Sequence, residues 1–264
     1  MLELRNITKI FNAGTVNEKT ALSELSLTLN PGDFVTIIGG NGAGKSTMLN
    51  VVAGVYPTDE GEIFIDGVDV TLLPEHKRAR YIGRVFQDPM MGTAADMWVE
   101  ENLAIADRRG QKRGFQWAIT KADKAAYQAA LAELDLGLET RMTTKMGLLS
   151  GGQRQAITLL MATLKRPKLL LLDEHTAALD PKTAAKVLEI TDRLIQENKL
   201  TALMVTHNMK DAIAHGNRLI MMNAGRIVLD VAGEEKKHLT IETLLEKFSQ
   251  ASGAEFASDR ALLG

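Results

Sequence analysis

The segment DFVTIIGGNGAGKSTMLNVVAG, Asp33 to Gly54, decides the fold class. It begins with a short apolar run, continues through a glycine-rich stretch and ends in residues with helical spacing. The pattern G-x-x-x-x-G-K-[ST] is fulfilled by Gly39, Gly44, Lys45 and Ser46. A strand before this pattern and a helix after it are the context that the pattern requires. The segment therefore predicts a phosphate-binding loop in an α/β protein.

Each part of this loop has a chemical task. Glycines let the backbone curl so that its N–H groups and the helix N-terminus face a β-phosphate. Lys45 supplies positive charge to the β and γ oxygens, and the Ser46 hydroxyl is suited to Mg²⁺. The expected nucleotide contacts are Gly39, Asn41, Gly42, Ala43, Gly44, Lys45, Ser46 and Thr47. An ordinary glycine-rich turn is the alternative, and kinases, GTPases and motor ATPases would satisfy the loop equally well.

A second apolar run, KLLLLDE from Lys168 to Glu174, ends in two adjacent acids. Mg²⁺ on nucleotide phosphates needs carboxylate support, and Asp173 at the end of a buried strand is our candidate. Glu174 lies one residue further on, where its carboxylate could hold or deprotonate the water that attacks the γ-phosphate, which contributes about 10²- to 10⁴-fold in rate. Two solvated acids are the alternative, but an apolar strand rarely ends this way unless positive charge lies nearby.

Composition excludes several classes of protein. The chain has 264 residues, 45% of them apolar, which suits one or two compact lobes rather than a disordered or fibrous protein. Its 31 basic and 33 acidic residues give a net charge of -2, so nucleic acid and anionic lipid are not default partners. Cysteine is absent, which excludes disulfides and zinc-thiolate sites. No window approaches the roughly 20 apolar residues that span a bilayer.

Apolar and alternating runs indicate how the chain is organised. DFVTIIG, KLLLLDE and TALMVTH are separated by helical patterns and predict buried strands of a parallel sheet. The first strands, with turns at Asn30-Pro31-Gly32 and Asp66-Gly67, predict an antiparallel meander. From about Pro89 to Arg166 the pattern is helical, as in a lobe inserted into the α/β core. After about Ala232 we expect a polar tail with one amphipathic helix, IETLLEKF, and a mobile end.

A third motif, LLSGGQRQA from Leu148 to Ala156, lies in the helical stretch. Ser150 and the two following glycines begin a predicted helix, which is an anion-binding N-terminus, but it is too far along the fold to reach the same chain's phosphate loop. Two copies arranged head to tail would let each contribute Ser150 and Gly152 to the γ-phosphate held by the other. With this motif the sequence resembles the nucleotide-binding subunit of an ATP-binding-cassette (ABC) transporter, from about Leu2 to Val231.

The resemblance implies a fold class and domain boundaries. The fold would be α/β, a P-loop NTPase core made of a RecA-like parallel sheet and an antiparallel β subdomain, with an inserted α-helical subdomain. We expect the ATPase core at 1–88 and 167–232, the helical subdomain with the signature motif at 89–166, and a C-terminal helical tail at 233–264.

The resemblance also implies roles for single residues. Gln87 in VFQDP matches the glutamine that joins the core to the helical subdomain, contacts Mg²⁺ and senses the γ-phosphate. His207 in VTHNM matches the switch histidine that contacts the γ-phosphate, and Phe11 stands where an aromatic stacks on adenine. Alone, either would more often be a core residue. The expected catalytic residues are Glu174, His207 and Gln87, the metal residues are Ser46, Gln87 and Asp173, and the further nucleotide contacts are Phe11, Ser150, Gly151, Gly152, Gln153 and Asp180.

The chain departs from the family pattern at His175, where proline usually follows the glutamate. The arginine-rich continuation after the signature is absent in RQAITLLMA, and GTVNEKTAL is longer than the usual link. Adjacent residues at a strand end face opposite ways, so we expect no catalytic role for His175. The departures leave the phosphate, metal and water-handling residues in place and suggest a subgroup of bacterial importers for small solutes, amino acids among them.

The expected function is ATP binding and hydrolysis that energises transport of a small solute across a membrane. The implied cofactors are ATP and Mg²⁺, and the implied partners are transmembrane permease subunits, a second nucleotide-binding subunit as a homodimer and, indirectly, a solute-binding protein, with no nucleic acid. The chain is expected at the cytoplasmic face of the cell membrane, peripheral through its partners. Alternatives are an exporter or lipid-extraction ATPase, a soluble non-transport ABC ATPase, and a P-loop kinase, which the signature and His207 disfavour.

Overall fold

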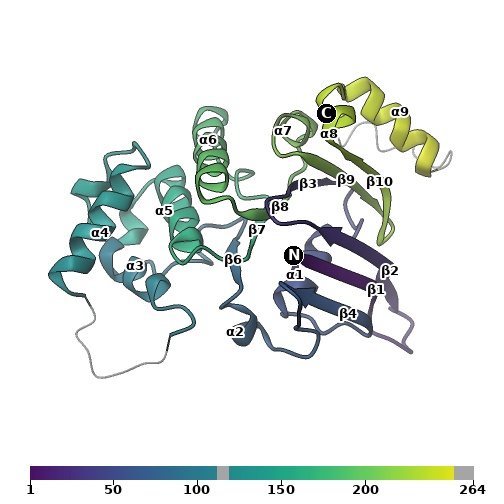
Figure 1. The fold of residues 1–264 in the computed structure, drawn as a ribbon, viewed down its shortest axis with the longest axis horizontal. Helices are drawn as coiled ribbons and strands as arrows, with labels where there is room; N and C mark the ends of the chain where they lie inside the picture. The colour runs from purple at the N-terminus through teal and green to yellow at the C-terminus, as the bar shows by residue number, and fades with distance from the viewer. Residues whose placement is uncertain (112–118, 253–264) are drawn as a thin grey trace.

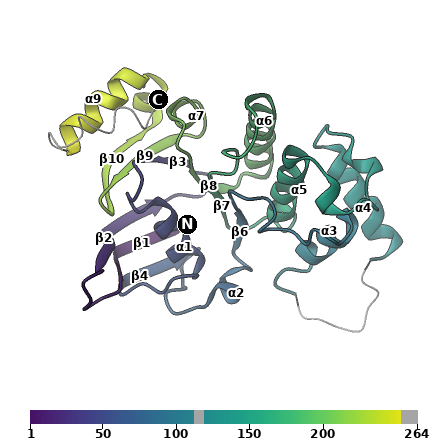
Figure 2. The ribbon, with the colours of Figure 1, turned by 180° about the vertical axis from the view of Figure 1, so that it is seen from behind.

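The structure, a computed structural model, describes residues 1–111 and 119–252 of the chain. Its elements form an antiparallel sheet, a mixed sheet beside it, and a group of helices at one end (Figure 1). The view from behind shows the same arrangement, with that helical group at the opposite end of the molecule from the antiparallel sheet (Figure 2). The predicted α/β class is thereby confirmed.

The mixed sheet contains the three strands that the apolar runs predict. Its strand order is β10-β9-β3-β8-β7-β6. Every residue of β3 and β8 is buried, because helices or the second sheet cover both faces. β9 also runs parallel to β3, and β10 pairs with β9 in antiparallel fashion. The strands are β3 (Phe34–Ile38), β6 (Ile82–Val85), β7 (Leu169–Asp173), β8 (Thr201–Val205), β9 (Arg218–Asn223) and β10 (Arg226–Ala232).

The antiparallel sheet has the order β2-β1-β4-β5. Asp66 and Gly67, both with positive φ, join its last two strands in the predicted tight turn. The expected continuous meander is wrong at Asn30-Pro31-Gly32, because this turn leads out of the sheet into β3. The fully apolar β3 needs cover on both faces, which only the mixed sheet offers. The strands are β1 (Leu2–Phe11), β2 (Lys19–Leu29), β4 (Glu60–Ile65) and β5 (Val68–Asp69).

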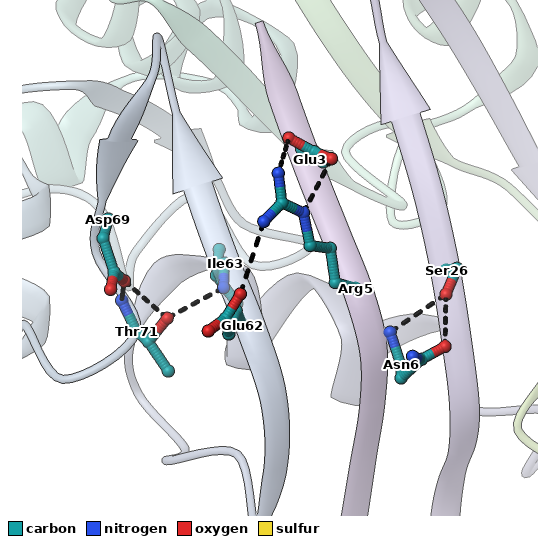
Figure 3. A network of polar contacts seen from close by, with 8 residues as sticks. All are labelled: Glu3, Arg5, Asn6, Ser26, Glu62, Ile63, Asp69 and Thr71. Carbon is teal, nitrogen blue, oxygen red and sulfur yellow. Dashed lines mark hydrogen bonds and ion pairs between the residues drawn. The ribbon is translucent and has the colours of Figure 1, made fainter.

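Polar contacts cover one face of the antiparallel sheet (Figure 3). The Arg5 guanidinium donates to both carboxylate oxygens of Glu3, at 2.8 and 3.0 Å, and to Glu62 at 3.4 Å. Asn6 has a positive φ at a register irregularity, where its N–H donates to Ser26 Oγ and its side-chain oxygen accepts from that hydroxyl. These bonds keep the outer face polar, while the inner face of the sheet is apolar.

Two helical layers cover the mixed sheet. Helix α1 (Lys45–Ala53) lies between the two sheets, and its buried residues share one apolar core with both of them. Helices α5 (Gly151–Thr163) and α6 (Pro181–Asn198) cover the other face and share a second core. A third cluster joins α7 (Met209–Ala214) and α9 (Ile241–Ser252) to β9. The α1 position directs its N-terminus, and so the phosphate loop, to the carboxyl end of β3.

The helical group is formed by the chain between β6 and β7. It contains α3 (Val99–Asp107), α4 (Lys121–Ala132), the short helices η1 (Leu138–Thr140) and η2 (Met146–Leu148), and α5. We propose the boundaries 89–166 for this subdomain and 1–88 with 167–232 for the core. Residues 112–118 lie outside the described residues.

The C-terminal region begins with α8 (Gly233–Lys237), and α9 then packs against β10 and α7. Part of the proposed tail 233–264, namely 253–264 with the end expected to be mobile, lies outside the described residues. In the described ranges, no helix has the length and apolar content that a membrane crossing requires.

Candidate nucleotide-binding and hydrolysis site

The phosphate loop connects β3 to α1 and forms the floor of a cleft. Glycine is required at two of its positions, because a Cβ on Gly39 would lie 2.3 Å from the Met222 oxygen and one on Gly44 would lie 2.6 Å from the Ala21 oxygen. The Gly44 backbone is left-handed, with φ 100°. The cleft is lined by Phe11, Lys19, Ala21, Asn41, Gly42, Ala43, Gly44, Lys45, Ser46, Thr47 and Glu174. Most of the predicted nucleotide contacts therefore meet in one place.

Lys45 is buried inside the loop. Its Nζ donates to the carbonyl oxygens of Gly39 at 2.7 Å and Gly40 at 3.1 Å. Burial lowers the pKa of the Lys45 ammonium, and the nearby carboxylates of Glu174 and Asp173 oppose that shift. The ammonium is thus held at the loop where phosphate oxygens would replace the carbonyls as acceptors.

Asp173 ends β7 beside the start of α1. The Ser46 hydroxyl donates to Asp173 Oδ1 over 3.3 Å, so two of the three predicted metal residues are neighbours. Burial raises the pKa of Asp173, and the charge of Arg84 opposes that shift. A hydroxyl and a carboxylate oxygen at this spacing fit Mg²⁺, which prefers oxygen ligands and takes the remainder from phosphate and water. In the described part of the chain no cluster of three or more acidic or histidine side chains forms a metal site by itself.

Arg84 is a neighbour of Asp173 that the sequence did not predict. It lies on β6, with one Nη 3.8 Å from Asp173 Oδ2 and 2.7 Å from Asn50 Oδ1. Its guanidinium also stacks 4.4 Å from the centre of the Phe86 ring. This is the positive charge that two acids at an apolar strand end require. A lone arginine inside the run IGRVF was the available signal.

Glu174 projects into the cleft and faces His207. The Nδ1 atom of His207 lies 3.5 Å from Glu174 Oε2, although the two residues follow different strands, β7 and β8. Glu174 has a left-handed backbone, with φ 45°, and its N–H donates to the Val205 oxygen. The structure therefore brings together Glu174, which is expected to handle water, and His207, which is expected to contact the γ-phosphate.

His175 points away from this cleft, as the sequence analysis expected. Its side chain is buried, with 2% exposed, and its Nε2 lies 3.0 Å from Thr191 Oγ1 on α6. Burial, with a smaller effect from the charge of His215, lowers the pKa of His175 to about 4, so its ring is neutral near pH 7.

Phe11 lines the cleft, whereas Gln87 is not among the described residues that line it. The Phe11 ring lines the cleft and lies edge-on to Tyr56, with ring centres 5.3 Å apart. Gln87 is exposed and follows β6, whose last residue Val85 pairs with Leu172. Gln87 therefore leaves the sheet at the edge where Asp173 ends its strand.

The signature residues lie at the start of α5 and are not among the described residues that line the cleft. Ser150 Oγ accepts from the Gln153 N–H, and Gln153 Oε1 accepts from the Ser150 N–H, which forms a capping box. Gly152 packs against α6, because a Cβ there would lie 2.0 Å from the Thr183 methyl. Asp180 caps α6 through the Thr183 N–H. Within one chain, the signature residues and Asp180 are therefore not part of the cleft that contains the phosphate loop.

Comparison with known proteins identifies the family. The family model described as ABC transporter matches residues 22–177, more than half of the chain. The chain belongs to the ABC transporter family. This cassette is 44% identical to the tyrosine transport ATP-binding protein of Clostridioides difficile, over 95% of the chain and 100% of the relative. The chain is also 33% identical to a methionine import ATP-binding protein of Corynebacterium efficiens. That alignment covers 86% of this chain and 61% of the relative.

Solved structures agree with this assignment. The cassette matches a dimeric ATP-binding cassette in a post-hydrolysis state, bound to ADP and phosphate, with TM-score 0.75 and 30% identity over 88% of this chain and 98% of that chain. It also matches a nucleotide-free cassette of an ABC transporter with TM-score 0.77 and 27% identity, over 97% and 99% of the two chains. The chain is therefore an ATP-binding, ATP-hydrolysing subunit whose turnover energises solute transport.

Proposed function

We propose that this cassette energises the import of an amino acid through partner transmembrane subunits at the cytoplasmic face of the membrane. The observation that carries the proposal is the similarity to the tyrosine transport ATP-binding protein, which extends over the full length of that relative. The segment EENLAIA, Glu100 to Ala106, also resembles importer subunits. An exporter or a soluble ABC ATPase gains no such support. A solute-binding protein would select the amino acid and deliver it to the membrane subunits.

Two cassettes would close on two molecules of ATP. The separation of the signature from the cleft supports this arrangement, because the helix N-terminus at Ser150 can reach a γ-phosphate only in a second chain. The similar cassette that was solved with ADP and phosphate is dimeric. Residues 150–153 of each copy would complete the site of the other, with Asp180 beside the contact between them.

The reaction follows from the groups around the cleft. Glu174 takes a proton from water as the water oxygen attacks the γ-phosphorus, and the bond from that phosphorus to the β–γ bridging oxygen breaks. Lys45 binds the β and γ oxygens, and His207 contacts the γ-phosphate. Mg²⁺, held by Ser46, Asp173 and Gln87, would supply positive charge to the same phosphates. ADP and phosphate then leave.

Coupling to the membrane subunits would pass through Gln87 and the residues that follow it. We define the docking surface as Gln87, Met90, Met91 and Trp98, which are all exposed. Met91 is 70% exposed and Trp98 43%, which argues against the alternative that they pack inside the helical subdomain. Methionine adapts to a partner's shape, and tryptophan is enriched at binding hot spots. Pro89, which lies between Gln87 and Met90 in the sequence, is buried and does not belong to this surface.

The change Met91→Lys tests the docking surface. A lysine would place charge in an apolar contact, and we expect at least about tenfold weaker assembly with the transmembrane subunits. ATP affinity should stay unchanged, because Met91 does not line the cleft. Co-purification with the membrane subunits and fluorescence titration with a labelled ATP analogue measure the two quantities.

Leu72→Lys is the matched control, because Leu72 is 95% exposed and lies outside the docking surface. This variant should assemble normally. If Met91→Lys also assembles with wild-type affinity, the docking surface is incorrectly located.

The solute is identified by reconstitution. The cassette, purified with its native membrane subunits and solute-binding protein in proteoliposomes, should hydrolyse ATP several-fold faster with tyrosine than without it. Methionine and spermidine serve as comparison solutes, because similar cassettes carry those names. Stimulation by spermidine alone would refute the amino-acid assignment, whereas stimulation by methionine would keep it and exclude tyrosine.

A further inference from the structure

The ring of His175 connects helix α6 to the carboxyl end of β7, next to Asp173 and Glu174. Glu174 faces the cleft, and the next side chain is directed to the opposite side, where α6 packs on the sheet. Its partner there, Thr191, is fully buried. The neighbouring charged groups are Asp192 and His215, which pair with each other at 2.7 Å, so Asp192 already has a partner other than His175.

The hydrogen-bond pattern fixes which atom donates. The Thr191 hydroxyl donates its only proton to the Val187 carbonyl over 2.8 Å. Its oxygen can therefore only accept from the ring, so His175 Nε2 carries hydrogen and donates over 3.0 Å. An apolar side chain or a proline at this position would leave the Thr191 oxygen without that donor.

The backbone beside the ring is in a costly conformation. Glu174 has φ 45°, in the left-handed region that residues with a side chain seldom adopt. Such a conformation persists only when its surroundings enforce it. The Glu174 N–H donates to Val205, and its carbonyl accepts from Ala177. The side chain of the next residue, His175, is held by burial and by the bond to Thr191.

We propose that His175 is a positioning residue for ATP hydrolysis, which acts by holding the Glu174 carboxylate toward the attacking water through its bond to Thr191. This inference rests on the proposed role of Glu174. The bond also ties the strand end to α6, the helix that begins behind Asp180 at the proposed dimer contact. Closure of the dimer would then shift α6, and α6 would in turn change the orientation of the Glu174 carboxylate through the bond between Thr191 and His175.

Four variants test the proposal. His175→Leu fills most of the space and removes the donor, whereas His175→Gln retains an N–H donor near the position of Nε2. Thr191→Val removes the acceptor and keeps the shape. Thr163→Val is the matched control, because the buried Thr163 hydroxyl bonds only to carbonyls of its own helix.

The expected results separate positioning from packing. His175→Leu and Thr191→Val should each lower kcat by about 10- to 100-fold, because a small misplacement of a catalytic group has effects of this size. The KM for ATP and the ATP affinity should change less than about twofold, since the phosphate loop is untouched. His175→Gln should recover most of kcat, and Thr163→Val should hydrolyse ATP like the wild type. A packing role would instead lower the melting temperature and leave kcat of the folded protein unchanged.

A Glu174→Gln background supplies the decisive comparison. If His175 acts through the Glu174 carboxylate, adding His175→Leu to Glu174→Gln should cause no further loss in single-turnover hydrolysis. A further loss of the same size as in the wild-type background would overturn the proposal, and so would normal kcat in folded His175→Leu. If Glu174→Gln alone hydrolyses ATP normally, the role of Glu174 is wrong, which is a failure of the proposed function rather than of the His175–Thr191 link.

Discussion

Glu174→Gln is expected to lower steady-state ATP hydrolysis by about 10²- to 10⁴-fold while ATP still binds. The amide keeps the size of the carboxylate but cannot accept a proton from water. The phosphate loop and Lys45 are unchanged, so the ATP-bound state should accumulate. Phosphate release measures the rate, and size-exclusion chromatography with ATP measures the dimer that this variant should trap.

The control for this prediction is Glu197→Gln, which removes a charge of the same type at an exposed position on α6. It should hydrolyse ATP at the wild-type rate. Near-normal turnover in Glu174→Gln would instead show that another group activates the water, with the nearby His207 as the first to examine.

Arg78→Met is expected to destabilise the fold by about 3 kcal/mol, because two of its bonds to carbonyl groups are fully buried and a buried carbonyl left without a partner costs about 1–3 kcal/mol. Arg78 is 2% exposed and donates to four carbonyl oxygens: Leu73 at 2.7 Å, Val51 at 2.8 Å, Val52 at 2.9 Å and Thr71 at 2.9 Å. Two of these acceptors belong to the last turn of α1, the helix that begins at the phosphate loop.

Calorimetry should show this loss as a decrease of about 6–12 °C in Tm. Arg80→Met is the control, because Arg80 is exposed and donates to the neighbouring Tyr81 hydroxyl. Its Tm should remain within about 2 °C of the wild type. An equal Tm for both variants would mean that the carbonyl groups find water or other donors when Arg78 is removed.

Much of the site could be predicted from sequence because its parts are contiguous. A strand, a glycine-rich turn and a helix N-terminus are adjacent along the chain, so the pattern from Gly39 to Ser46 defines its own local geometry. The same holds for the run that ends in Asp173 and for the helix N-terminus at Ser150. The order of these motifs led to the correct family and fold class.

The errors and omissions share another cause. The turn at Asn30-Pro31-Gly32 has the composition of a hairpin turn, but whether the next strand stays in the sheet depends on which surface can cover an apolar strand. Lys19 lines the cleft without belonging to any motif. The signal for Arg84 was a single charge in an apolar strand. Such a charge indicates that the arginine has a polar partner, but it does not identify that partner.

The amino-acid sequence alone was enough to locate the phosphate loop, the acids after the buried strand and the signature helix, and to indicate the nature of the reaction. Their chemistry depends on neighbours a few residues away. The folded chain was needed to show that Arg84 faces Asp173, that Arg78 binds the end of α1 and that His175 donates to Thr191. Each of these pairs joins distant parts of the chain in a buried place. An unpaired polar group is costly there, so each group needs a partner. Packing of the whole chain, rather than the local sequence pattern, determines which groups meet.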